Sequence, residues 1–170
     1  MNIRTLTASI AVMLLSTAAA AGWAHGTDGA APEAAGTSNP ATLVQLETVR
    51  RATAQFLDEQ AAIDAGYVDI SVFYPNMGHH YLKPAALDAT FELETPELLV
   101  YADDPCSGAR RLVAVEYAAP VDLLKEAPAG FIGTDDRWTV NQQFQLWTLH
   151  VWLYEHNPAG VFASHNVRVP

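Results

Sequence analysis

Residues 146–154 read LWTLHVWLY, and this stretch indicates the class of fold. Its aromatic and aliphatic residues are typical of a β-strand. Side chains alternate between the two faces of a strand, so Leu149 and Val151 share one face while His150 and Trp152 share the other. A strand with one wet face would alternate apolar and polar residues, and this one does not. The stretch therefore predicts a strand covered on both faces, in which His150 needs a polar partner.

Three further runs predict strands that accompany it. Residues 97–102, ELLVYA, and 111–118, RLVAVEYA, flank the turn-like segment DDPCSGA and predict a hairpin. Residues 78–82, GHHYL, predict a fourth strand. The run at 111–118 is also apolar on both faces, with Glu116 as its exception.

A helix is predicted before these strands. Asn39 and Pro40 form a helix start, with asparagine as the cap and proline in the first turn. The apolar residues that follow recur at helical spacing up to Gly66; they are Leu43, Leu46, Val49, Phe56 and Ile63. We expect an α+β fold, a mostly antiparallel sheet with one long N-terminal helix, about 40–65, packed on one face.

The first residues have the pattern of a secretory signal. Met1 to Arg4 form a short positive start, an apolar run from Ile10 to Leu15 follows, and alanines at 18–21 offer cleavage sites. We expect a signal peptide at 1–24, a flexible leader at 25–39 and a single α+β domain at 40–170. The predicted location is periplasmic or secreted.

Composition excludes some classes of partner. The formal net charge of −10 argues against nucleic-acid binding, which needs a basic face. No run after the signal approaches the ~18 apolar residues of a membrane span. The oligomeric state is left open by the sequence.

The buried polar residues predict a metal site. An unpaired carboxylate in apolar surroundings carries a large penalty unless it is neutralised, hydrogen-bonded or bound to a cation. Glu116 and His150 are therefore either satisfied by each other and the backbone, or they meet a histidine of GHHYL. Of that pair we expect His80 to point inward, because Gly78 leaves space on its face, and His79 to point to the other face. Two histidines and a carboxylate suit zinc, copper or iron.

Other residues extend this hypothesis or compete with it. His79, His156 and His165 are possible additional ligands. The function predicted first is an exported metal-binding domain, with the question of catalysis left open. The alternative is a non-enzymatic domain that binds a small apolar ligand in an aromatic pocket formed by Tyr81, Trp138, Trp147, Trp152 and Phe162.

Several motifs together resemble a group of uncharacterised exported bacterial proteins. They are MGHHY at 77–81, VEY at 115–117, LHVWL at 149–153 and NPAGVF at 157–162. The resemblance implies export and equates His80 with the histidine of a Met-Gly-x-His-Tyr motif. This chain departs from the pattern at residues 146–148, where Leu-Trp-Thr replaces His-Tyr-Asp, and at SHNV, 164–167, which replaces Trp-Asn-Pro. If the missing upstream histidine ligates metal in the group, either His79 or His165 substitutes for it here, or the metal hypothesis is weakened.

Overall fold

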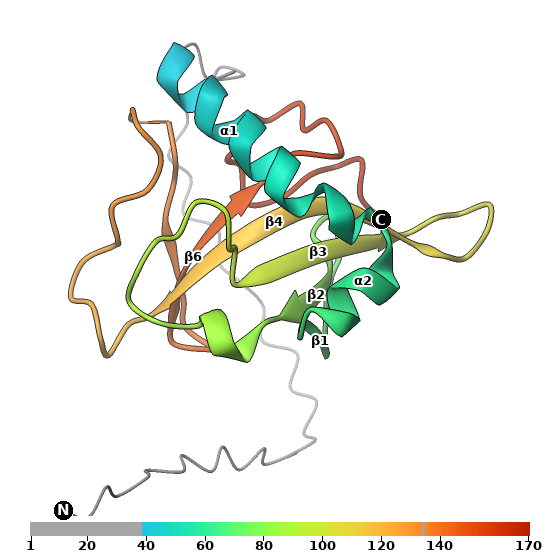
Figure 1. Ribbon diagram of the computed structural model, residues 1–170, viewed down its shortest axis with the longest axis horizontal. Helices are drawn as coiled ribbons and strands as arrows, with labels where there is room; N and C mark the ends of the chain where they lie inside the picture. The colour runs from blue at the N-terminus through green and yellow to red at the C-terminus, as the bar shows by residue number, and fades with distance from the viewer. Residues whose placement is uncertain (1–38, 134) are drawn as a thin grey trace, which may run out of the picture. The chain divides into compact units, whose positions relative to one another are not determined.

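The computed structural model describes residues 39–133 and 135–170 (Figure 1). The predicted signal peptide at 1–24 and all of the predicted leader except Asn39 lie outside the described residues. Within the described part, no helix is long and apolar enough to cross a membrane.

The core of the fold is a six-stranded antiparallel sheet in the order β1-β2-β3-β4-β6-β5. The predicted hairpin is confirmed as β3 and β4, and GHHYL is confirmed as β2. The strands are β1 (Val68–Tyr74), β2 (Gly78–Leu82), β3 (Leu98–Asp103), β4 (Arg110–Pro120), β5 (Thr139–Asn141) and β6 (Leu146–Val151). With helical segments before the sheet, the fold is α+β.

The two outer strands, β1 and β5, were not predicted from the sequence. The pairing of β1 with β2 shifts register between Asp69 and Phe73, and Ser71 between them has a positive φ of 56°. This irregularity interrupts the period-two pattern by which a strand is recognised. β5 is only three residues long. The strand expected at 146–154 ends at Val151, so its last three residues lie beyond the sheet.

The single long helix expected at 40–65 is wrong. The segment forms the α-helix α1 (Pro40–Thr53), the 3₁₀ helix η1 (Ala54–Leu57) and the short α-helix α2 (Glu59–Asp64). Asn39 caps α1 as expected, accepting a bond of 3.0 Å from the Ala41 amide. Asp58 causes the break, because it is extended and its side chain caps α2 through the Gln60 amide. A further 3₁₀ turn, η2 (Pro84–Ala86), precedes β3.

Two groups of buried apolar residues lie on opposite faces of the sheet. The larger includes side chains from the helical segments, such as Val49 and Phe56, and from the central strands, such as Leu99, Tyr117 and Leu149. Leu43 and Ile63, expected in the buried stripe, are exposed instead. The smaller cluster is formed by Val100, Ala102, Val113, Ala114, Trp152 and Val169.

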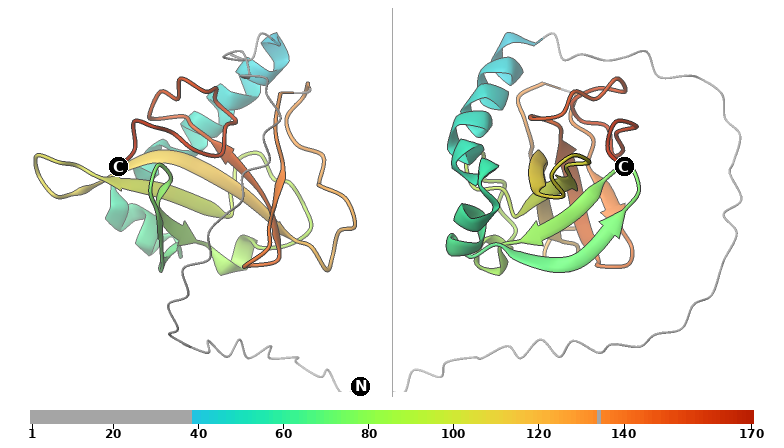
Figure 2. Two further views of the ribbon diagram at one scale, coloured as in Figure 1. Left: turned by 180° about the vertical axis from the view of Figure 1, so that it is seen from behind. Right: turned by 90° about the vertical axis from the view of Figure 1, so that its right-hand side faces the viewer.

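The sheet is curled, as Figure 2 shows, so its outer strands turn toward each other. Tyr74 of β1 donates a hydrogen bond of 3.0 Å to Gln143 in the turn between β5 and β6, which joins the two outer parts of the sheet. Asn76, in the turn between β1 and β2, is bonded through its backbone to Pro170 and to Asn166. The C-terminal residues are thereby fixed beside that turn.

Candidate metal centre

His80, Glu116 and His150 lie on the face of the sheet opposite the larger core. In sequence, His80 precedes Tyr81, Glu116 follows Val115, and both neighbours belong to that core. His150 lies between Leu149 and Val151, which belong to it too. Alternation along a strand therefore directs all three polar side chains to the other face. Each of the three residues is only 4% exposed.

The three side chains come from β2, β4 and β6, and they meet although β3 separates the first two strands. His150 pairs directly with Glu116 across the β4–β6 ladder. His80 pairs with Val100 of β3, which pairs with Ala114, two residues before Glu116. The residue from β2 reaches the carboxylate because the sheet curls. One potential ligand atom from each residue lies within 4.8 Å of the others.

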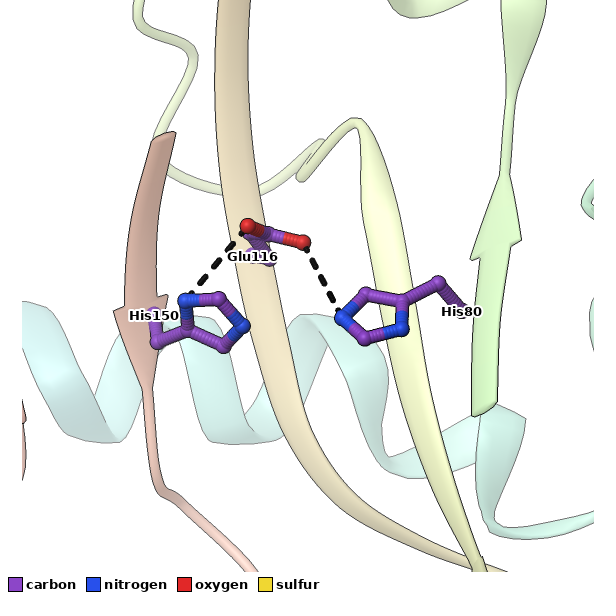
Figure 3. A group of neighbouring side chains, drawn as sticks. All are labelled: His80, Glu116 and His150. Carbon is purple, nitrogen blue, oxygen red and sulfur yellow. Dashed lines mark ion pairs between the residues drawn. The ribbon is translucent and has the colours of Figure 1, made fainter. Parts of the chain in front are cut away.

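Both imidazole rings are turned toward the carboxylate (Figure 3). His80 Nε2 lies 3.6 Å from Glu116 Oε2, and His150 Nδ1 lies 3.4 Å from Glu116 Oε1. The two rings are nearly perpendicular, at 88°, with centroids 5.9 Å apart. The trio is thus assembled around one carboxylate.

These separations are longer than hydrogen bonds and match a shared ion. An N–H···O hydrogen bond spans about 2.7–3.2 Å. Two donors that each bind one tetrahedral ion at about 2.1 Å lie about 3.4 Å apart. The two histidine–glutamate distances, 3.6 and 3.4 Å, are close to the second value. The geometry therefore suits a cation between the side chains better than direct hydrogen bonds among them.

The second ring nitrogen of His80 supports this assignment. His80 Nδ1 lies 3.2 Å from the Val72 carbonyl oxygen of β1. A proton on Nδ1 donated to that carbonyl leaves the lone pair of Nε2 facing the carboxylate, as is usual for a histidine that ligates metal. His150 Nε2 is fully buried and has no hydrogen-bond partner among the described residues. It is the second nitrogen of the ring whose Nδ1 faces Glu116, and one imidazole cannot hold the same ion through both nitrogens, so a water molecule or a ligand in the neighbouring pocket would have to satisfy it.

The electrostatics favour neutral imidazoles. Burial lowers the pKa of His150 to about 3, and the nearby His80 and His165 lower it too. Burial also lowers the pKa of His80. Burial raises the pKa of Glu116 to about 8, with a contribution from Glu97, while a hydrogen bond from Thr148 opposes the rise. Neutral imidazole is the form that binds metal, and a cation would draw the proton off Glu116.

The other histidines do not join the group. His79 Nε2 lies 3.2 Å from Asp103 Oδ2, and its ring packs against Phe73 at 4.7 Å between centroids. His156 is exposed and lines a different surface pocket. His165 is exposed at the rim of the pocket above the three residues. Within the described residues, His79, His156 and His165 are therefore not part of the group formed by His80, Glu116 and His150.

A pocket of about 270 Å³ opens above the trio. His80, Glu116, His150 and the buried Thr148 form its floor, and Thr139, Asn141, Ser164 and His165 supply polar groups around it. Its walls are apolar and come from four strands and the β5–β6 turn; they include Ile70, Val72, Leu82, Leu98, Phe144 and Leu146. The walls contributed by β1 were missed by sequence reasoning because β1 itself was not recognised. Thr148 was detectable, since it precedes His150 by two residues and shares its face.

The five aromatic residues proposed as a ligand pocket do not line a common cavity in the described part of the chain. Tyr81 and Phe162 are buried in the larger core, and Trp138 packs against it. Trp147 is half-buried and donates to the Leu124 carbonyl. Trp152 belongs to the smaller core cluster, where its ring lies nearly parallel to that of His150 at 17°. The spacing of these aromatic residues in the sequence therefore reflects packing in the core of the protein and not a ligand pocket.

Comparison of the chain with protein-family models, curated proteins and solved structures gives no match. The functional argument therefore depends on the geometry of the site.

Proposed function

We propose that the chain is a metal-binding domain in which His80, Glu116 and His150 hold one divalent ion. The observation that carries this proposal is the set of three buried donors within 4.8 Å, each from a different strand. The separations from the carboxylate and the carbonyl partner of His80 Nδ1 support it. A structural role alone would not require two buried imidazoles at more than hydrogen-bond distance from a carboxylate.

The donor set limits the ion to a first-row transition metal. Imidazole nitrogen suits zinc, copper and iron, whereas calcium and magnesium prefer oxygen donors throughout. Two histidines and one carboxylate occur in open zinc sites and in non-haem iron sites, and both leave positions for a further ligand. Zinc is the first ion to test, because its tetrahedral geometry fits the observed separations.

Metal analysis of protein purified without an affinity tag tests the proposal. We expect about one zinc, copper or iron per wild-type chain. His80→Ala and His150→Ala should each reduce bound metal at least tenfold, because two donors do not hold a transition ion as three do. Glu116→Gln should do the same, since it keeps the side-chain shape and removes the charge.

His79→Ala is the matched control, because His79 is adjacent in sequence but lies on the other face of the sheet. It should retain the wild-type metal content. Far-ultraviolet circular dichroism shows whether each variant folds. If His150→Ala does not fold, His150→Gln takes its place, because glutamine fills more of the space left by the imidazole. Equal loss in all variants, His79→Ala included, would contradict the assignment, and so would a wild-type protein that takes up no metal.

A further inference from the structure

The pocket above the proposed metal site combines a polar floor with apolar walls. The donors lie at its bottom, where Glu116 and His150 are each 4% exposed. Aliphatic side chains from β1, such as Ile70, and the aromatic ring of Phe144 flank it. A ligand that enters the pocket would therefore place one polar end on the floor and its apolar part against the walls.

The floor leaves a coordination position open toward the pocket. Three protein donors fill three positions of a tetrahedral ion, and a fourth remains for water or a ligand. The pocket is lined by the three donors, so the space that holds this fourth position is the pocket itself. A ligand in the pocket can thus bind the ion directly.

The volume limits the ligand to a small molecule. A cavity of about 270 Å³ lies just below the range of pockets that hold drug-sized ligands. At about 30 Å³ per water molecule, it offers room for about nine non-hydrogen atoms. A peptide, a polysaccharide or a nucleotide would not be enclosed.

Charge selects an anion. A divalent ion balanced by the single carboxylate of Glu116 retains one positive charge. Among the described residues that line the pocket, Glu116 is the single acidic residue, and none is lysine or arginine. A buried net charge is costly until it is neutralised, so a monoanionic ligand fits the floor better than a neutral one.

We infer that the pocket binds a small monoanion with a short apolar tail, of the class of C4–C7 aliphatic carboxylates, whose carboxylate ligates the metal. This inference rests on the proposed metal site and adds the chemical class of its ligand. The carboxylate occupies the open position, and the tail lies between the walls formed by β1 and by the β5–β6 turn.

Cobalt(II) provides the test, because its visible absorption reports a change of ligand. The full chain is loaded with cobalt(II) and titrated with hexanoate and, separately, with acetate. Both probes carry the same head group, and hexanoate has four more methylenes, each worth about fourfold in affinity when buried. We expect hexanoate to bind at least tenfold more tightly than acetate. His80→Ala, which removes a proposed ligand, should show neither the cobalt spectrum nor a response.

Substitutions in the pocket walls test whether these walls cause the tighter binding of hexanoate. Phe144→Ser in an exposed turn and Ile70→Ser in an outer strand should weaken hexanoate severalfold and leave acetate and cobalt content unchanged. Leu123→Ser is the matched control, because Leu123 is 59% exposed and does not line the pocket. It should leave both affinities unchanged.

The outcomes separate the two proposals. Cobalt bound at one per chain with equal affinities for hexanoate and acetate would overturn the ligand class and leave the metal site standing. A preference for hexanoate that Leu123→Ser weakens as much as Phe144→Ser would overturn the pocket as its source. No cobalt uptake by the folded chain would overturn both.

Discussion

Glu97 is a second buried carboxylate, and it lies outside the metal site. It is 2% exposed, and its Oε2 accepts a hydrogen bond of 2.9 Å from the Ala118 amide. Burial raises the pKa of Glu97 to about 7, with backbone hydrogen bonds opposing and the nearby Asp88 and Glu92 adding to the rise. The folded state therefore holds a proton that the unfolded chain releases near pH 4.5. Stability linked to Glu97 is present at low pH and is lost as the pH rises through about 7.

Glu97→Gln should remove this pH dependence. The amide is neutral at every pH, so the unfolding free energy of the variant minus that of the wild type should rise between pH 4.5 and pH 8. The rise in the pKa of Glu97 from 4.5 to about 7 corresponds to about 3 kcal/mol. Urea denaturation of both proteins across this pH range gives the difference directly.

An exposed carboxylate provides the control for this measurement. Glu126→Gln changes the same charge at an exposed position, where a substitution should alter stability by less than about 0.5 kcal/mol. A difference for Glu97→Gln that stays flat with pH would show that Glu97 is ionised in the folded protein.

Single residues of the site were predictable, and their surroundings were not. Alternation along GHHYL and polarity within apolar strands were sufficient to select His80, Glu116 and His150, which the structure brings together. Val72 contacts His80 through its backbone carbonyl, and a backbone contact has no signature in the sequence.

At the scale of single elements, β2 depends on a glycine for a reason other than the one expected. Gly78 has a φ of +105°, and an added Cβ would lie 2.5 Å from the Tyr101 carbonyl oxygen of β3. Space beside His80 is therefore a lesser requirement than backbone conformation and the close approach of two strands.

Gly78→Ala should consequently destabilise the protein by at least ~2 kcal/mol, because it adds a clash with backbone to an unfavourable φ. It should also lower metal content, since β2 must shift relative to β3 and carries His80. Gly66→Ala separates the two effects: Gly66 has a φ of +92° and no atom within 4 Å of an added Cβ. It should cost about 1 kcal/mol and leave metal content unchanged. Denaturation and metal analysis that give equal results for the two variants would contradict this account.

The helical region shows where element boundaries escaped prediction. Apolar spacing continues from Leu46 past Phe56, and both side chains are buried. The break is made by Asp58, whose side chain prefers to cap a new helix and thereby competes with continuation of the first. In a sequence, an aspartate that caps a new helix cannot be distinguished from an aspartate on the exposed side of a continuous helix. Only the backbone conformation distinguishes these two cases.

On the scale of the whole molecule, the proposed ion would connect strands that are distant in sequence. Its donors lie in β2, β4 and β6, and the unfolded chain does not hold them together. Zinc at a hundredfold excess over its dissociation constant should therefore stabilise the fold by ~2.7 kcal/mol. Thermal midpoints with and without zinc check this, and His79→Ala should respond like wild type. Equal stabilisation of His80→Ala would place the bound zinc elsewhere.

Export is a prediction about the whole chain that depends on residues 1–24. The mature protein should begin between Ala21 and His25, where the small-residue cleavage sites lie. Intact-mass spectrometry of protein from the exported fraction checks the N-terminus. An intact Met1 in that fraction would contradict the prediction.

The order of strands could not be predicted, because pairing in a sheet depends on contacts between distant segments. A hairpin was readable where two strong strands flank a short turn. The placement of β2 beside β3, and of β6 between β4 and β5, depends on the curl of the sheet and on two outer strands with weak sequence patterns.

The irregularity of those outer strands affects how copies of the protein meet. An exposed edge of a sheet offers unpaired amides and carbonyls to another chain, which is a route to aggregation. Here one edge, β1, carries a register shift and a residue with positive φ, and the other, β5, is three residues long. Neither offers a long, flat template for edge-to-edge pairing. The features that hid these strands from sequence reasoning therefore also protect the folded protein from self-association through its sheet.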